Sequence, residues 1–122
     1  MSQIKKEIVK TDTQNHFQKL MPMTSEAFER LAEVSFQEGV LTAKTKELIA
    51  IGIAVHSGCD DCINYHIHKA VDLNLTRDEI LEAMGVGLEM GAGQLIPPIK
   101  RALKAHFPDL PPKSSADLTT KE

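Results

Sequence analysis

The stretch KTKELIAIGIAVHSGCDDCINYHIHKAV, residues 44–71, decides which kind of fold this chain can adopt. Residues 48–55 within it form a run without a polar side chain. Such a run fits a helix that is buried on all sides, or else a buried strand, since Ile and Val are β-branched. The polar residues that lead into it favour the helix, with Thr42 as its N-cap and Gly58 as its end. We therefore predict a helix over about residues 43–57.

Helical patterns also occupy most of residues 22–107, and a strand–turn–strand pattern occurs nowhere in the sequence. Pro22 marks the start of one helix, and Thr76 with Glu79 forms a capping box at the start of another. The further helices are predicted from about Pro22 to a stop at Gly39, from Cys59 to Leu73, from Thr76 to Met90, and from Ile96 or Pro97 to Phe107, with a kink or break at Gly91 and Gly93. The predicted fold class is therefore all-α, a compact helical domain of about five to six helices.

The length of 122 residues is that of a single domain. We expect an N-terminal arm at residues 1–20, the helical domain at 21–107, and a polar, disordered tail at 108–122 that is rich in Pro, Ser and Thr. The N-terminal sequence has no apolar run of the kind that a signal peptide needs. We therefore expect a cytoplasmic protein, in a compartment where thiols are kept reduced.

Composition and charge exclude two broad classes of partner. The net charge is −3 and the Lys and Arg residues are scattered, which gives no basic surface for nucleic acid. No stretch reaches the ~18 to 20 apolar residues of a membrane-spanning helix. However, the predicted helices at 43–57 and 76–90 are almost entirely apolar, and a monomer of this size cannot easily cover both. We therefore expect an obligate homo-oligomer without a nucleic acid or membrane partner.

Cys59 and Cys62 are the only cysteines, and they stand at the predicted start of a helix. Residues three apart lie on one face of a helix, and the amides and the dipole at its N-terminus stabilise a thiolate. Such a pair in a reducing compartment is typical of redox-active or metal-binding sites. His66 follows Cys62 by one helical turn, within reach of its sulfur directly or through one water. It can therefore take a proton from the thiol and return it.

Glu47 is the next candidate because it begins the apolar run. If the helices on either side of Gly58 pack as an antiparallel pair, Glu47 points into or beside their shared core. A carboxylate there needs a partner, because an unpaired buried charge is costly, and His66 is the obvious one. In the predicted relay, Glu47 orients and charges the imidazole of His66, which in turn activates Cys62.

Asp60 and Asp61 separate the two cysteines, where a reactive thiolate least favours negative charge. Like-charge repulsion from two carboxylates raises the pKa of a neighbouring thiol. We therefore expect Cys62 to be a less acidic nucleophile than the one in a typical redox Cys-x-x-Cys pair.

Together, Glu47, Cys59, Cys62 and His66 form the pattern E-x11-C-x-x-C-x3-H. Over about residues 24–107 the sequence resembles the alkylhydroperoxidase D-like core of the carboxymuconolactone decarboxylase superfamily, as a short member with a single helical unit. The resemblance implies an all-helical fold that assembles as a homo-trimer or a homo-hexamer. Lactone decarboxylation is not expected, because that branch generally lacks the cysteine pair, and we expect no cofactor.

The resemblance further implies a thiol-dependent antioxidant peroxidase, or dithiol–disulfide oxidoreductase, and a role for each residue of the pattern. Cys62 attacks the hydroperoxide, and Cys59 resolves the sulfenic acid into a disulfide. His66 and Glu47 relay the proton through water. The expected partners are a small hydroperoxide or disulfide substrate and a thioredoxin-like or lipoyl-type dithiol that reduces the enzyme.

Three other functions use the same residues. Cys59, Cys62 and His66, with His56 or His68 as a fourth ligand, could form a zinc site, although the apolar helices supply a core without a metal. The chain could also be a non-enzymatic oligomeric module for binding or redox sensing. A general disulfide reductase or oxidase would use the same dithiol. We expect His56 and His68 to be mainly structural.

Overall fold

The structure is a computed structural model, and it describes residues 16–109 together with residues 111, 114 and 116. Its labelled helices are α2 (Pro22–Phe36), α3 (Ala43–Ser57), α4 (Asp60–Asp72), α5 (Arg77–Gly93) and α6 (Ile96–His106). A further helical turn covers residues 16–20, and the described part of the chain contains no strand. The prediction of an all-α fold is therefore confirmed. Residues 1–15 of the expected arm and most of the expected tail lie outside the described residues.

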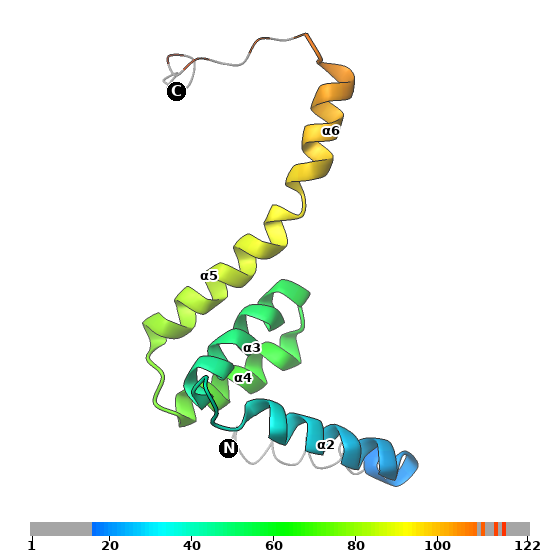
Figure 1. Ribbon diagram of the computed structural model, residues 1–122, viewed down its shortest axis with the longest axis vertical. Coiled ribbons are helices and arrows are strands. Elements are labelled where there is room, and N and C mark those ends of the chain that lie inside the picture. Colours follow the sequence, from blue (N-terminus) through cyan, green and yellow to red (C-terminus); the bar gives the residue numbers. More distant parts are fainter. Residues whose placement is uncertain (1–15, 110, 112–113, 115, 117–122) are drawn as a thin grey trace.

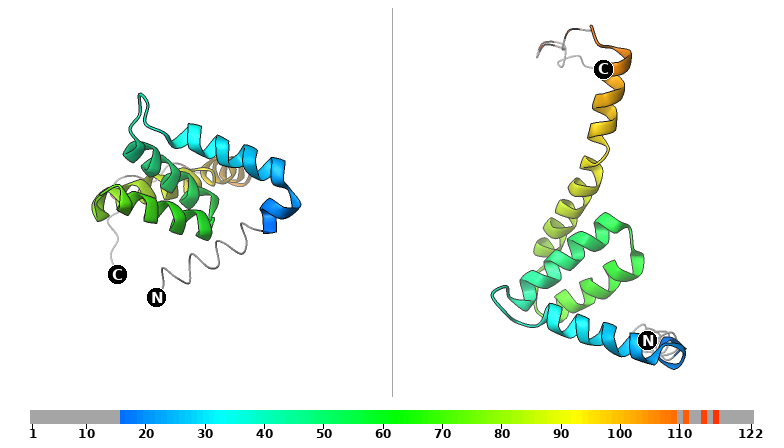
Figure 2. Two further views of the ribbon diagram at one scale, coloured as in Figure 1. Left: turned by 90° about the horizontal axis from the view of Figure 1, so that it is seen from below. Right: turned by 45° about the vertical axis from the view of Figure 1, so that its right-hand side comes forward.

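Helix α3 lies at the centre of the molecule and has neighbours on more than one side (Figure 1). It pairs with α4 as an antiparallel helical hairpin, and α5 packs against it from another side. Helix α2 lies across the hairpin and contacts α3 over a shorter length. Helix α6 continues beyond the end of α5 and points away from the other four, as the right-hand view of Figure 2 shows. The molecule is consequently elongated, with α2 towards one end and α6 at the other.

The ends of α3 are set by the residues that the sequence indicated. The Thr42 hydroxyl accepts a hydrogen bond from the Thr45 amide at 3.1 Å, which caps the N-terminus of the helix. Gly58 ends the helix in the left-handed conformation, with a φ of 67°, which glycine adopts without a steric penalty. The chain therefore reverses within Gly58 and Cys59, and α4 begins at once beside α3.

Helix α2 ends earlier than the sequence predicted. Its last residue is Phe36, whereas the predicted stop was Gly39. The Glu38 carboxylate accepts a hydrogen bond from the first amide of α3 at 2.9 Å, and the Gln37 carbonyl accepts one from the Lys46 ammonium at 2.6 Å. These contacts with the first turn of α3 take the place of the last turn predicted for α2.

Helix α5 ends later than the sequence predicted. The break expected at Gly91 and Gly93 occurs, but slightly later, because the helix continues to Gly93. Glycine inside a helix costs only about 1 kcal/mol relative to alanine. Pro97 and Pro98, by contrast, lack the amides that would bond to the carbonyls of Gly93 and Gln94 in a continuous helix. The interruption therefore falls at Gln94 and Leu95, immediately before α6.

The buried core is small and lies mainly where α3, α4 and α5 meet. Its apolar members are Ile51, Ala54, Ala70, Leu75 and Ile80. Gly52 and Gly87 allow the backbones of α3 and α5 to approach closely. A Cβ atom added to Gly87 would lie 3.0 Å from the Gly52 Cα and would overlap with the Gly52 carbonyl oxygen. Backbone contact, rather than large side chains, thus joins these two helices at this point.

Large apolar side chains on the outer faces of α2, α5 and α6 stay exposed in the protomer. Leu103 of α6, for example, is 52% exposed. This apolar surface supports the expected homo-oligomer, which stays a prediction. Within the described part of the chain, none of the helices combines the length and the apolar character that crossing a bilayer requires.

Candidate functional site

Glu47 and His66 meet inside the α3–α4 hairpin. Oε2 of Glu47 lies 2.8 Å from Nδ1 of His66, and Glu47 is only 5% exposed. An ionised carboxylate can only accept a hydrogen bond, so the bond is donated by Nδ1–H of the imidazole. The other ring nitrogen, Nε2, is therefore the one that can take up a proton. The pairing that the sequence predicted for Glu47 is confirmed.

Two aromatic rings hold the imidazole of His66 from different directions. The Phe36 ring, at the end of α2, stacks on it with 5.3 Å between the ring centroids and 19° between the planes. The Tyr65 ring meets it edge-on, at 5.0 Å and 89°. Both arrangements are favourable for aromatic rings. Phe36 was absent from the predicted site, because no local signal in the sequence shows that the last residue of α2 reaches α4.

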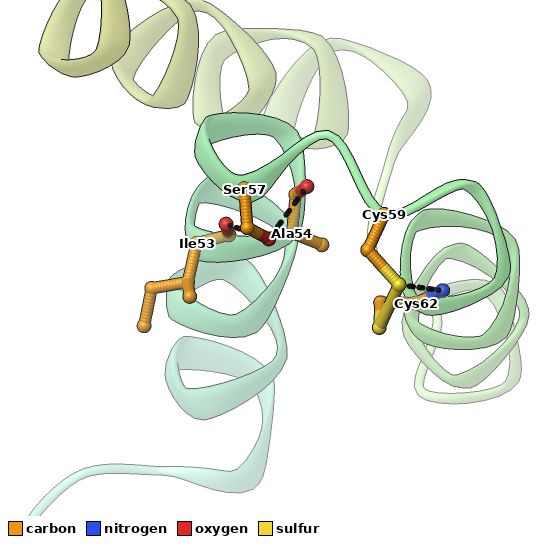
Figure 3. Close-up of a disulfide and its surroundings, with 5 residues drawn as sticks. All are labelled: Ile53, Ala54, Ser57, Cys59 and Cys62. Carbon is orange, nitrogen blue, oxygen red and sulfur yellow. Dashed lines mark hydrogen bonds between the residues drawn. A yellow bond between two sulfur atoms is a disulfide. The ribbon is translucent and has the colours of Figure 1, made fainter.

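Cys59 and Cys62 are joined by a disulfide at the start of α4 (Figure 3). Cys59 is the N-cap of this helix, and its Sγ accepts a hydrogen bond from the Cys62 amide at 3.3 Å. The donor at the helix end is thus directed at the Cys59 sulfur rather than at the Cys62 sulfur. Asp60 and Asp61 occupy the first turn, where carboxylates suit the positive end of the helix dipole.

The end of α3 faces the disulfide but contributes no hydroxyl to it. The Ser57 hydroxyl donates back to the carbonyls of Ile53 and Ala54, at 3.0 and 3.2 Å (Figure 3). Serine commonly forms such bonds to the preceding turn of its own helix. Ser57 is therefore a helix-terminal residue and not a partner of the thiols.

The disulfide and the buried pair lie on one helix, α4, at successive turns. His66 follows Cys62 by four residues, so the imidazole and the sulfur project from the same side of α4. Cys62 is exposed and Cys59 is half-buried, whereas the His66 side chain is 18% exposed. The arrangement places an accessible sulfur one turn from a shielded imidazole that a carboxylate orients. Such a set can move a proton to and from a thiol.

The zinc alternative has no support in this geometry. Within residues 16–109, no group of three or more His, Cys, Asp or Glu side chains is placed to hold a metal ion. Nδ1 of His66 is bonded to Glu47, and the two sulfurs are bonded to each other. His56, expected as a possible fourth ligand, instead contacts Gln94. The Nε2 atom of His56 lies 2.5 Å from the Nε2 atom of Gln94.

A groove of about 700 Å³ runs along the surface between α3 and α5, on another side of the molecule. Its apolar walls and polar ends are formed mainly by Ile49, Ile53, His56, Glu82, Val86 and Met90. His56 comes nine residues after Glu47, which is about two and a half helical turns. The groove and the Glu47–His66 pair therefore lie on opposite sides of α3.

The helical fold with this Glu–Cys–Cys–His set has a match among known families. Residues 22–105 match the sequence model of the carboxymuconolactone decarboxylase family. The chain belongs to this family. The family resemblance proposed from the spacing of Glu47, the two cysteines and His66 is thereby confirmed.

Solved structures of the carboxymuconolactone decarboxylase family superimpose on this chain. A ligand-free family protein from Legionella pneumophila is 39% identical, with a TM-score of 0.66, over 85% of this chain and 91% of that one. A family protein from Thermotoga maritima with a suggested part in an antioxidative response is 33% identical, with a TM-score of 0.55. That match covers 66% of this chain and 84% of the Thermotoga chain.

Curated sequences of uncharacterised proteins also match part of this chain. An uncharacterised protein of Cupriavidus necator is 39% identical over 72 residues, which are 59% of this chain and 64% of that protein. Uncharacterised protein 4 in the cox locus of Paracoccus denitrificans is 37% identical over 78 residues, which are 64% of this chain and 70% of that protein. The chain thus spans about two thirds of the length of these curated relatives.

Proposed function

We propose that this chain is a thiol-dependent peroxidase, with Cys62 as its nucleophile and Cys59 as its resolving thiol. The observation that carries this function is the 2.8 Å contact between Glu47 and His66, one helical turn from Cys62. In such a set the thiol is the nucleophile, the imidazole is its base, and the carboxylate orients the base. A disulfide that only stabilised the fold would need no such neighbours. The Thermotoga relative with a suggested antioxidative role supports the same chemistry.

In the first step, the Cys62 thiolate attacks the terminal oxygen of a hydroperoxide ROOH. The O–O bond breaks, Cys62 becomes a sulfenic acid, and RO⁻ leaves. His66 has taken the thiol proton on Nε2 and delivers it to RO⁻, directly or through a water, so that the alcohol ROH forms. The Glu47 carboxylate stabilises the imidazolium, because it is buried and accepts from Nδ1–H.

In the second step, the Cys59 thiol condenses with the Cys62 sulfenic acid. The S–O bond breaks, water leaves, and the Cys59–Cys62 disulfide of the structure forms. Cys59 is suited to react as a thiolate, because its sulfur accepts the Cys62 amide hydrogen bond at the start of α4. Both sulfurs lie within one turn of one helix, so the condensation needs no second protomer.

A dithiol donor of the thioredoxin-like or lipoyl type closes the cycle. One donor thiolate attacks the disulfide to give a mixed disulfide, and the second donor thiol releases the reduced enzyme. In sum, the hydroperoxide becomes an alcohol and water, while the donor dithiol becomes a disulfide. We assign this reaction to a small hydroperoxide in the cytoplasm, carried out by a homo-trimer or homo-hexamer as the family resemblance implies.

Peroxide consumption in the presence of a dithiol donor tests this function. Cys62→Ser is expected to lose turnover down to the rate of protein-free buffer. Cys59→Ser is expected to stop at the sulfenic acid, which dimedone traps at Cys62 and mass spectrometry detects. Asn64→Ala, in α4 but outside the relay, is the matched control and should keep the wild-type rate. Wild-type turnover in both cysteine variants would contradict the assigned roles.

A general disulfide reductase or oxidase is the second candidate, and the disulfide itself favours it. It would use the same two sulfurs but exchange electrons with a protein disulfide instead of a peroxide. Rates measured side by side with a hydroperoxide and with a protein disulfide separate the two activities. A faster rate with the hydroperoxide, lost on Cys62→Ser, is the result expected for the peroxidase.

A further inference from the structure

Helix α6 presents an apolar stripe that no described residue of its own protomer covers. The helix side chains Ile96, Ile99 and Leu103 and the C-cap residue Phe107 are between 46% and 56% exposed, and no residue of the helix is buried. Their spacing of three or four residues places them along one side of a helix. A stripe of this kind is typical of a helix that packs against another surface.

The α3–α5 groove is a second surface that none of the helices α2 to α6 covers. Ile53 is 63% exposed and Val86 is 64% exposed, although both line the groove. The floor is formed where Gly52 and Gly87 bring the two backbones together, so the groove is shallow and has helical walls on both sides. Two parallel walls of exposed apolar side chains suit the insertion of a helix between them.

We propose that α6 of one copy of this chain docks in the α3–α5 groove of a second copy. The two surfaces match in length. The stripe from Ile96 to Phe107 extends for about 16 Å at 1.5 Å per residue, and the groove residues of α3 from Thr45 to His56 cover the same distance. The docked helix would bury its stripe against both walls of the groove at once.

The two surfaces also match in charge. Helix α6 carries Lys100, Arg101 and Lys104 and contains no acidic residue. The groove lining includes the carboxylates of Glu79 and Glu82 and no Lys or Arg. Lys100 and Lys104 lie beside the apolar stripe, one turn apart, so they meet the acidic rim when the stripe enters the groove. Complementary charge at the rim favours this partner over an acidic helix.

The groove of the same protomer is not available to α6. Gln94 and Leu95, which join α5 to α6, both keep right-handed helical angles, with φ and ψ of −65° and −19° and of −81° and −16°. The chain therefore continues in the general direction of α5 and does not reverse. The Gln94 side chain is bonded to His56 at the end of the groove, which holds this direction. Figure 1 shows α6 leading away from α3 and α5.

Each chain offers both α6 and the α3–α5 groove, so exchange between copies satisfies both surfaces in a closed assembly. Reciprocal exchange gives a two-fold dimer, and head-to-tail exchange gives a ring. This contact explains how copies of the chain recognise one another, which goes beyond the peroxidase chemistry. Its test measures mass and not turnover, so the two ideas fail independently.

Light scattering of the full chain after size exclusion tests the contact. The wild type is expected at a multiple of its 13.5 kDa mass. Leu103→Glu places a charge in the stripe and Ile53→Glu places one in the groove, so each variant alone is expected to run as a monomer. Ala105→Glu adds the same charge to the opposite side of α6 and should keep the wild-type mass. A monomeric wild type, or wild-type mass in Leu103→Glu, would overturn the contact.

Mixing the two monomeric variants gives the decisive result. Leu103→Glu keeps an intact groove, and Ile53→Glu keeps an intact α6, so one productive contact can form between them. The mixture is expected to contain a species of about twice the 13.5 kDa monomer mass, although neither variant forms it alone. A mixture that stays monomeric would show that α6 and the groove do not bind each other.

Discussion

The two sides of helix α3 differ in how completely their side chains are partnered. On one side, Glu47 is buried against His66, and His66 is held by Phe36 and Tyr65. On the other side, Ile53 lines an open groove and stays exposed. One protomer therefore contains the complete Glu47–His66 pair but only part of its apolar packing. The difference shows that the proposed chemistry and the proposed assembly depend on separate faces of a single helix.

Glu47→Gln should slow the proposed chemistry at the Glu47–His66 pair while leaving the α3–α5 groove intact. Glutamine keeps the shape of the side chain but cannot balance the charge of an imidazolium, so proton transfer at Cys62 loses its support. We expect the rate of peroxide reduction to fall about 100-fold, the lower range for losing acid–base catalysis. Light scattering should show the wild-type mass. Glu89→Gln, on exposed α5 surface, is the matched control, and an undiminished rate in Glu47→Gln would rule out the relay.

Gly87→Ala should disturb the contact between α3 and α5 at the floor of the groove. The added methyl group overlaps with the Gly52 carbonyl, so α3 and α5 must separate. We expect the free energy of unfolding to fall by about 2 kcal/mol, as is usual for overpacking. Gly85→Ala, two residues away, meets nothing within 4 Å, and higher helix propensity should raise stability by about 0.5 to 1 kcal/mol. Denaturant unfolding of the pair measures both effects, and equal midpoints would contradict the close contact.

Phe36→Leu should loosen the imidazole of His66 without removing its carboxylate partner. Losing the stacked ring costs about 1 kcal/mol of aromatic contact, which corresponds to roughly a five-fold lower rate if it is needed to orient His66. The ring protons of His66 should also change chemical shift in an NMR spectrum. Phe28→Leu, on the exposed face of the same helix, should change neither quantity. An unchanged rate together with shifted ring protons would show that the stack serves packing alone.

Replacing Asp60 and Asp61 by Asn should have the smallest effect, a change in the reactivity of the neighbouring thiols. Both carboxylates lie in the first turn of α4, next to the thiols, and their repulsion of a Cys62 thiolate is partly screened by water. We expect alkylation of the reduced protein at neutral pH to become about three-fold faster, a difference of under 1 kcal/mol. Added salt should shrink the difference. Asp72→Asn, at the far end of α4, controls for net charge, and a slower reaction in the double variant would contradict the repulsion.

Much of the fold could be predicted because its signals are local. The Thr42 cap, the Gly58 turn and the capping box of Thr76 each act within one or two helical turns, and all three occur as expected. The Glu47–His66 contact could also be predicted, because it needs only two helices joined by a tight turn. In contrast, the end of α5 depends on competition between tolerated glycines and Pro97, which lies beyond the helix.

Other features depend on how distant elements are oriented. The stack of Phe36 on His66 requires the angle at which α2 crosses the α3–α4 hairpin, and no residue of α2 indicates that angle. The groove between α3 and α5 likewise requires the packing direction of two apolar helices. An apolar run shows that a helix must be covered, but it does not show which element covers each side.

The tight turn at Gly58 and Cys59 has a consequence for the order of folding. It confines Glu47, both cysteines and His66 to a continuous stretch of twenty residues. Contacts between residues so near in sequence form early, because closing a short loop loses little entropy. During synthesis this hairpin emerges from the ribosome before α5 and α6 do. The disulfide joins residues only three apart, so it cannot tie distant segments into a wrong topology. A chain oxidised while it is being made should therefore reach the same fold as a reduced one.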